Sequence, residues 1–260
     1  MQSLIAGASS GLGASLLRRF GGQAFQRGGD AAQAAADHGK PFDLIVHCAV
    51  DMAKAVTHDN IESYFRNNVE LTRTLLEIPH RRFVYLSSID VYPKSTALCR
   101  EDAAINAHDI SGVYGVAKYY AEALVRGHAT APLILRASAL LGPGMRENSL
   151  LRMLKTPGAP IGLSGASTFN YISHADVGDL IEAANAEGVS GIVNCSASSS
   201  VSLEDIRAHF GLSVRFGDFL YRTPDIDNGT AVALVPALGR SSLEIVQHFW
   251  ASHSAEFVAQ

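Results

Sequence analysis

Tyr114 and Lys118 lie four residues apart in the stretch Tyr114-Gly115-Val116-Ala117-Lys118. Because a helix advances about 3.6 residues per turn, side chains at this spacing share one face and can point into the same cleft. A free phenol has a pKa near ~10, too high for proton transfer at neutral pH. A neighbouring ammonium group favours the phenolate and lowers that pKa, which makes Tyr114 a candidate general acid or base. The same spacing also occurs in ordinary surface helices, so the surrounding elements must decide.

A glycine-rich turn follows the first expected strand, the apolar run 3–6. A helical pattern begins within the turn and ends at Phe20, before two glycines. Glycines at 7, 11 and 13 allow the tight turn and the close backbone approach that a pyrophosphate needs, and the N–H groups of the helix start face the anion. A tight structural turn is the alternative. The predicted dinucleotide-binding residues of this turn are Gly7, Ser9, Ser10, Gly11, Leu12 and Gly13.

The end of the second expected strand, 24–26, indicates which dinucleotide is bound. An acidic residue there would bind the ribose hydroxyls of NAD, but Gln26 and Arg27 occupy the region. Arg27 is a candidate ligand of the NADP 2′-phosphate, or alternatively a solvated surface residue. We therefore favour NADP over NAD. The next strand begins near Phe42, so the usual third strand is expected to be short or missing.

Three further apolar strands, at 42–49, 82–86 and 133–136, alternate with helical stretches at 59–78 and 112–126. This alternation predicts an α/β fold with a doubly wound parallel sheet. Ligands bind at the carboxyl ends of such strands, where Cys48 and Ala49 end one strand and Ser87-Ser88 end another. We place Cys48 and Ala49 beside the cofactor. Asn68 interrupts an apolar helix face and is either a hydrogen-bonded core residue or part of a cofactor-side network.

Composition excludes several other classes of function. The net charge of −4 gives no reason to expect nucleic acid or an anionic membrane as a partner. Three cysteines without a CxxC pair, and ten histidines without ligand spacing, indicate neither a disulfide framework nor a metal site. The start of the chain lacks a signal-peptide pattern, and no apolar run approaches the ~20 residues that span a bilayer. We expect a cytoplasmic protein.

The alternation of buried strands and long helices ends at about residue 145, and shorter elements follow one another after it. We predict a dinucleotide-binding domain at 1–144 and a small substrate-binding lobe at 145–260, with segments at about 169–210 returning to the first domain. The expected elements of the second part are helices at 147–155, 176–186 and 203–210, a loop at 158–167, and strands at 169–172 and 191–196.

Several ordered motifs together resemble the extended branch of the short-chain dehydrogenases/reductases, the NAD-dependent epimerase/dehydratase family that modifies nucleotide sugars. The run 87–92 (S-S-I-D-V-Y) resembles the S-S-x-x-V-Y motif of this branch, and Leu135-Arg136 with 142–144 (G-P-G) resembles L-R…G-P-G. Asn68-Val69 before two leucines resembles its N-V…L-L helix, and 169–177 resembles its D-F-I-H-V-D-D-V signature.

The resemblance implies a role for each matching residue. Ser88 takes the place of the catalytic serine, Tyr114 that of the proton donor, and Lys118 that of its partner, which also holds the nicotinamide ribose. Two departures matter. The glycine spacing G-x-x-x-G-x-G is typical of the non-extended branch. Ile89-Asp90 stands where dehydratases carry an Asp-Glu pair, which argues against dehydration and leaves Asp90 as a substrate-side acid/base or a hydrogen-bonding residue.

The favoured function is an NADP(H)-dependent 4-keto reductase acting on a nucleotide-linked sugar, because the run 88–94 also resembles deoxysugar epimerase-reductases that use NADPH. A 4-epimerase with retained NAD is the alternative within the family. A dinucleotide-sensing binding protein is the alternative of a different class, although it would not need Tyr114 and Lys118 together. A terpenoid or aryl ketone remains open as substrate, and a homodimer through the Tyr–Lys helix is expected by analogy. The candidate substrate contacts are Asp90, Asn148, Arg152 and Arg222.

Overall fold

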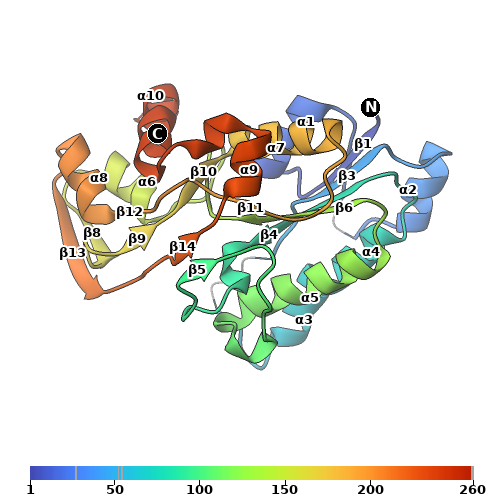
Figure 1. The fold of residues 1–260 in the computed structure, drawn as a ribbon, viewed down its shortest axis with the longest axis horizontal. Coiled ribbons are helices and arrows are strands. Elements are labelled where there is room, and N and C mark those ends of the chain that lie inside the picture. The colour runs from blue at the N-terminus through green and yellow to red at the C-terminus, as the bar shows by residue number, and fades with distance from the viewer. Residues whose placement is uncertain (27, 52, 54, 259–260) are drawn as a thin grey trace.

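The computed structural model describes residues 1–26, 28–51, 53 and 55–258, and a six-stranded parallel sheet forms its centre (Figure 1). The strand order is β11-β6-β4-β3-β1-β2, and all five neighbouring pairs are parallel. This arrangement confirms the predicted doubly wound α/β fold. The strands are β1 (Ser3–Ala6), β2 (Gln23–Phe25), β3 (Leu44–His47), β4 (Phe83–Ser88), β6 (Pro132–Ala137) and β11 (Gly191–Cys195).

One edge of the sheet is shorter than in the usual dinucleotide-binding arrangement. In the doubly wound order 3-2-1-4-5-6, another strand lies outside the second one. Among the described residues, β2 itself forms the edge. The chain passes from β2 through α2 (Ala31–His38) directly to β3, as the short stretch before Phe42 predicts.

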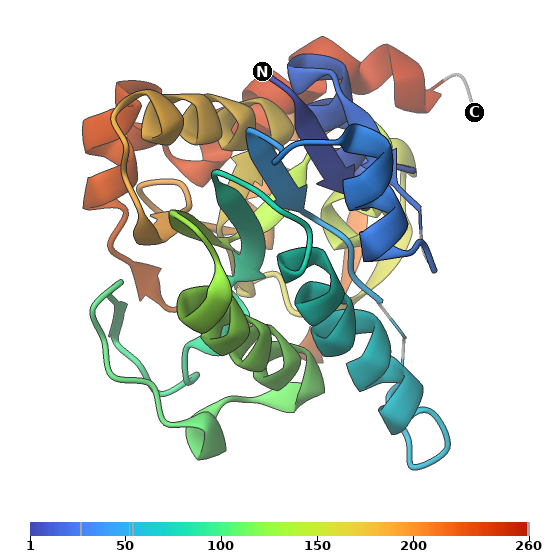
Figure 2. The ribbon, with the colours of Figure 1, turned by 90° about the vertical axis from the view of Figure 1, so that its right-hand side faces the viewer.

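Helices cover both faces of the sheet, because successive side chains of each buried strand point to opposite sides. In β1, Ile5 packs in the cluster that contains α1 and α7, whereas Leu4 packs in the cluster that contains α4 and α5. Figures 1 and 2 both show α1 and α7 on one face and α4 and α5 on the other. These helices are α1 (Gly11–Phe20), α4 (Leu71–Leu76), α5 (Gly112–His128) and α7 (His174–Ala186).

The helical stretch expected at 59–78 is confirmed between residues 61 and 76, with a π-helical segment inside it. It begins as α3 (Ile61–Phe65), widens into the π-helical segment η1 (Arg66–Glu70) and continues as α4. Asn68 lies inside η1, where its amide nitrogen donates to the carbonyl oxygen of Tyr64 at 2.9 Å. Its amide oxygen accepts from the backbone N–H of Asp51 at 2.8 Å. Asn68 thus connects the loop after β3 to this helix. These bonds fit the first of its two interpretations, a hydrogen-bonded core residue.

The second half adds paired short strands beside the sheet. The expected loop at 158–167 is wrong in its first part, because β8 pairs there with β13. The sequence did not indicate this strand because it contains Pro160 and Gly162, and both residue types are depleted in strands. The elements are β5 (Leu98–Cys99), β7 (Ala139–Leu141), α6 (Ser149–Lys155), β8 (Ala159–Leu163), β9 (Thr168–Phe169), β10 (Tyr171–Ser173), β12 (Val201–Ser202), α8 (Leu203–Phe210), β13 (Val214–Phe219), β14 (Asp225–Ile226), α9 (Gly229–Leu234), η4 (Pro236–Gly239) and α10 (Ser242–Val258), with the 3₁₀ turns η2 (Ile89–Val91) and η3 (Ala107–Asp109).

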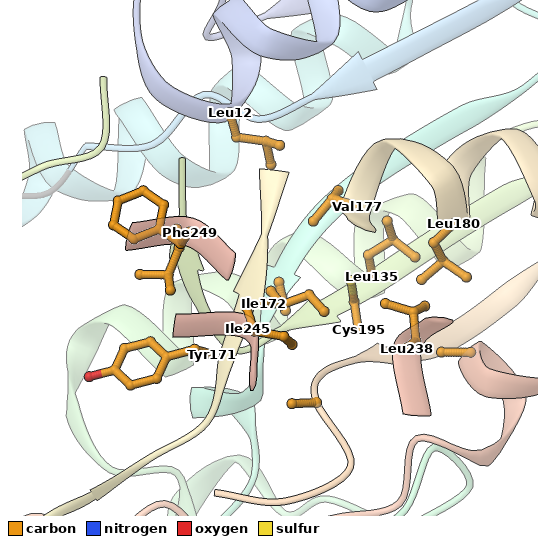
Figure 3. Close-up of a cluster of buried hydrophobic side chains, with 14 of the residues drawn as sticks. Leu12, Leu135, Tyr171, Ile172, Val177, Leu180, Cys195, Leu238, Ile245 and Phe249 are labelled. Carbon is orange, nitrogen blue, oxygen red and sulfur yellow. The ribbon is translucent and has the colours of Figure 1, made fainter. Parts of the chain in front are cut away.

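One hydrophobic cluster joins the sheet to these additions. It contains Leu12 of α1, Leu135 of β6 and Val177 of α7, together with Ile245 and Phe249 of α10 (Figure 3). Residues of α6, β8 and α8 belong to the same cluster. The second half therefore packs onto one face of the sheet, and the proposed division at residue 144 stays a prediction.

Candidate active site

A cleft of about 880 Å³ is lined by most of the predicted cofactor residues and by two of the three predicted catalytic residues, whereas Ser88 and Asn68 do not line it. Tyr114 and Lys118 of α5 line it, as the spacing of these two residues predicts. Cys48 and Ala49, at the end of β3, line it as well. The whole glycine turn contributes Gly7, Ser9, Ser10, Gly11, Leu12 and Gly13.

The glycine turn is so tight that two of its positions have no room for a side chain. Gly7 has a φ of +88°, and a Cβ there would lie 2.6 Å from the backbone nitrogen of Ala49. A Cβ on Gly13 would lie 2.1 Å from the carbonyl oxygen of Gly7. The turn therefore folds back on the start of α1, whose free N–H groups can face an anion.

The Gly13→Ala variant is expected to lose dinucleotide affinity by at least roughly tenfold, because relieving such a contact costs about 1–3 kcal/mol and displaces the turn. Gly127→Ala is the matched control, since a Cβ on this helical glycine meets nothing within 4 Å. Titration of NADH fluorescence measures both variants. Equal affinity of the Gly13→Ala variant and the wild type would contradict the assignment of this turn.

The adenine end of the cleft is formed by Ala24, Phe25 and Gln26 at the end of β2. Among the described residues at this strand end, none is acidic. Arg27, the candidate ligand of a 2′-phosphate, lies outside the described residues. Deeper in the cleft, burial raises the pKa of Cys48 to about 12, so this residue is a thiol at neutral pH.

Tyr114, Ser88 and Lys118 meet at the carboxyl end of β4. The buried hydroxyl of Ser88 lies close enough to the half-buried Tyr114 to lower its pKa. The Nζ of Lys118 donates to the carbonyl oxygen of Leu86 at 2.7 Å and lies 5.9 Å from the centroid of the Tyr114 ring. A hydroxyl group, a phenol and an ammonium group thus lie together, as the reduction of a carbonyl group requires.

The pKa of Tyr114 differs from the sequence-based expectation. Burial and the charge of Asp90 raise this pKa, while the neighbouring Ser88 opposes the rise. Burial also lowers the pKa of Lys118 to about 8. The expected lowering of the Tyr114 pKa by Lys118 is therefore wrong, because burial is the largest cause of the shift and Lys118 is not among its causes.

A close backbone contact and a buried ion pair hold α5 against the sheet. A Cβ on Gly115 would lie 2.3 Å from the carbonyl oxygen of Asp90, so the helix touches the turn after β4. Behind the site, Glu122 is bound by Arg136 at 2.8 and 3.0 Å and accepts a hydrogen bond from Ser87 at 2.6 Å. These contacts fix α5 relative to β4 and β6, and therefore Tyr114 relative to Ser88.

The candidate substrate residues lie in different places. Asn148 lines the cleft, although its side chain caps α6 by accepting from the N–H of Leu151 at 2.9 Å. Asp90 lies beside Ser88. Arg152 is exposed and pairs with Glu147, and Arg222 is exposed next to Thr168. Neither arginine lines the cleft, so their substrate roles stay predictions.

Several cleft residues were missed by sequence reasoning. Arg146 and Glu147 line the cleft directly after the G-P-G run, whose position could have indicated them. His174 also lines it and is buried, and its Nδ1 has no hydrogen-bond partner in the described part of the chain. Only its place in the 169–177 signature could have pointed to it.

Two buried histidines predict how stability depends on pH. Burial lowers the pKa of His174 to about 4 and that of His47 to about 3, against about 6.5 in an unfolded chain. Below pH ~6.5 the unfolded chain therefore binds more protons than the folded one, so stability falls as the pH drops towards these values. Each histidine changes the free energy of unfolding by at most about 1.4 kcal/mol per pH unit. Urea unfolding between pH 7 and 5 should show a shallower slope for His174→Gln than for the wild type, and equal slopes would contradict this account.

The described residues contain no group of three or more His, Cys, Asp or Glu side chains that could hold a metal ion. None of the helices in the described ranges is both long and apolar enough to cross a bilayer.

Comparison with known proteins agrees with this geometry. The profile of the NAD dependent epimerase/dehydratase family matches residues 27–157, half of the chain. No curated protein matches the sequence.

Similar solved structures show the same fold over nearly the whole chain. UDP-glucuronic acid 4-epimerase from Bacillus cereus, in complex with UDP-glucuronic acid and NAD, is 18% identical, with 99% of this chain and 100% of the other covered and a TM-score of 0.79. MoeE5 in complex with UDP-glucose and NAD is 20% identical, with 98% and 100% covered and a TM-score of 0.78. RMD from Pseudomonas aeruginosa complexed with NADPH is 14% identical, with 96% and 99% covered and a TM-score of 0.72. The chain belongs to the NAD dependent epimerase/dehydratase family.

Proposed function

We propose that this protein is a nicotinamide-dependent 4-keto reductase of a nucleotide-linked sugar, with Tyr114 as proton donor. The observation that carries the proposal is that Tyr114 and Lys118 line the cleft that begins at the glycine turn, with Ser88 beside Tyr114. The family supplies the chemistry class.

The cleft fits a dinucleotide. Gly7 and Gly13 have no room for a Cβ because each packs against neighbouring backbone, which keeps the turn as tight as a pyrophosphate-binding turn must be. Gln26 and Lys118 both line the cleft, and we assign Gln26 to the adenine end and Lys118 to the nicotinamide ribose. When bound, the nicotinamide supplies the hydride.

The side chains of this protein supply the proton and the electrostatic stabilisation. Ser88 donates a hydrogen bond to the carbonyl oxygen, and Tyr114 gives it a proton as negative charge develops there. The raised pKa of Tyr114 keeps the phenol protonated, which suits a donor. The positive charge of Lys118 stabilises the phenolate that remains.

We prefer NADP, exchanged at each turnover, because no acidic residue is found among the described residues at the end of β2. The 4-epimerase is the second candidate. It is favoured by the structural likeness to the UDP-glucuronic acid 4-epimerase, whose structure contains NAD.

A thermal-shift screen tests this proposal, since a ligand that binds only the folded state raises the unfolding temperature. The probes are NADPH, NADH, UDP and dTDP, each alone and with the cofactor. We expect a larger shift with NADPH than with NADH, and a further shift with a nucleoside diphosphate. The absence of any nucleoside diphosphate shift would count against a nucleotide-linked substrate, and copurified, tightly held NAD would favour the epimerase.

We also propose that two chains pair through α5, as the family resemblance implies. Tyr120 of this helix is 51% exposed, and Ile61 of α3 is 42% exposed. Light scattering of the purified protein should give twice the chain mass of 27.6 kDa. The mass of a single chain would contradict the pairing.

A further inference from the structure

The turn after β4 contains an ion pair that touches the catalytic serine. The Nζ of Lys94 donates to one carboxylate oxygen of Asp90 at 2.9 Å. The other oxygen accepts from the hydroxyl of Ser88 at 3.3 Å, and the backbone N–H of Asp90 donates to the same hydroxyl at 3.1 Å. The Asp90 carboxylate is therefore held between a cation and Ser88.

Lys94 is itself held by the C-terminal half of the chain. Its Nζ donates to the Tyr221 hydroxyl at 3.3 Å and lies 5.1 Å from the centroid of that ring. The Tyr221 ring stacks on Phe169 at 4.9 Å, and Phe169 stacks on the buried Tyr171 at 5.9 Å. An aromatic stack anchored in the core thus sets where the ammonium group lies.

The charge of Asp90 acts on the candidate proton donor. After burial, it is the largest cause of the raised pKa of Tyr114. Burial lowers the pKa of Lys94, but Asp90 and Tyr221 together outweigh burial and raise it overall, so Lys94 remains a cation. The other titratable or hydrogen-bonding groups that face Tyr114 are Ser88, Lys118, Tyr64 and Tyr85.

We propose that Lys94 is a positioning residue of this site: it holds the Asp90 carboxylate against Ser88 and partly neutralises the charge that Asp90 presents to the Tyr114 hydroxyl. Asp90 favours the protonated phenol, which is the form that donates in a reduction, and Lys94 limits this preference so that the proton can still leave. The proposal rests on the proposed function in assigning the donor role to Tyr114.

The test measures the ionisation of residue 114 without any substrate, so it is independent of whether the nucleotide-sugar assignment holds. 3,5-Difluorotyrosine is incorporated at position 114, because fluorine brings the phenol titration into an accessible pH range, and ¹⁹F NMR follows the single label. The titration is repeated in Asp90→Asn, Lys94→Gln and the double variant. We expect the pKa to fall by about one unit in Asp90→Asn and to rise in Lys94→Gln, as for a charge near a titrating group.

The double variant is decisive, because the part of the Lys94 effect that acts by holding Asp90 should disappear once Asp90 is neutral, so the Lys94→Gln shift should shrink. Lys94→Arg keeps the charge, so the label at position 114 should titrate as it does in the parent. This variant separates loss of charge from loss of packing. Arg66→Gln breaks an exposed pair with Glu62 on α3 and should leave the titration unchanged. Identical titrations in the parent, Asp90→Asn and Lys94→Gln would overturn the proposal, and so would a Lys94→Gln shift that is equally large beside Asp90→Asn.

Discussion

The Tyr114→Phe variant is expected to lose turnover by roughly 10²–10⁴-fold, the usual contribution of a positioned proton donor. Phenylalanine keeps the ring but removes the hydroxyl, whose pKa Ser88 lowers. Binding of the cofactor should be nearly unchanged, because the loss concerns a contact made to the developing alkoxide. The measurement is kcat and KM with NADPH and a UDP-linked 4-keto-6-deoxyhexose.

Tyr120→Phe is the matched control on the same helix, where the side chain is 51% exposed and outside the cleft. It should retain the activity of the wild type. Undiminished turnover in Tyr114→Phe would remove the proton-donor assignment, whereas a loss of NADPH binding in that variant would point to a cofactor-binding role instead.

The Glu122→Gln variant is expected to lower the free energy of unfolding by about 3–5 kcal/mol, because it leaves a buried guanidinium without its counter-ion. Glu122 is 0% exposed and Arg136 is 2% exposed, so water cannot replace the lost charge. Arg136 also lies over the ring of Tyr92, 4.7 Å from its centroid, which prevents it from turning away. Urea unfolding at pH 7 measures the loss.

Two comparison variants separate charge from packing. The pair Glu122→Leu with Arg136→Met should recover more than half of the loss, since an apolar pair of similar volume can replace a buried ion pair. Glu62→Gln breaks the exposed pair with Arg66 and should cost less than about 1 kcal/mol. A Glu122→Gln variant as stable as the wild type would show that the buried pair does not fix α5.

The parts of this protein that follow from local sequence were predicted well. The glycine turn at residues 7–13 and the Tyr114–Lys118 spacing depend on backbone sterics and helix geometry, which neighbouring residues determine. The apolar strands of the sheet depend on hydrophobic runs. These features therefore appear in the sequence before any tertiary contact is considered.

The features that arise from packing could not be predicted in the same way. The pKa of Tyr114 depends on how deeply α5 packs against β4, and burial reverses the direction expected from Lys118 alone. Lys94 and Tyr221 are 127 positions apart and meet only through the fold. β8 was missed because its pairing with β13, and not its own residue types, makes it a strand.

Transfer of deuterium from the cofactor tests the central claim most directly. The protein is incubated with NADPH deuterated at C4 of the nicotinamide, once for each face of the ring, and with a UDP-linked 4-keto-6-deoxyhexose. The account predicts that one of the two cofactors delivers deuterium to C4 of the sugar, detected by mass spectrometry and NMR, and that NADP⁺ accumulates in equal amount. A sugar product without deuterium from either cofactor, or no consumption of NADPH, would contradict it.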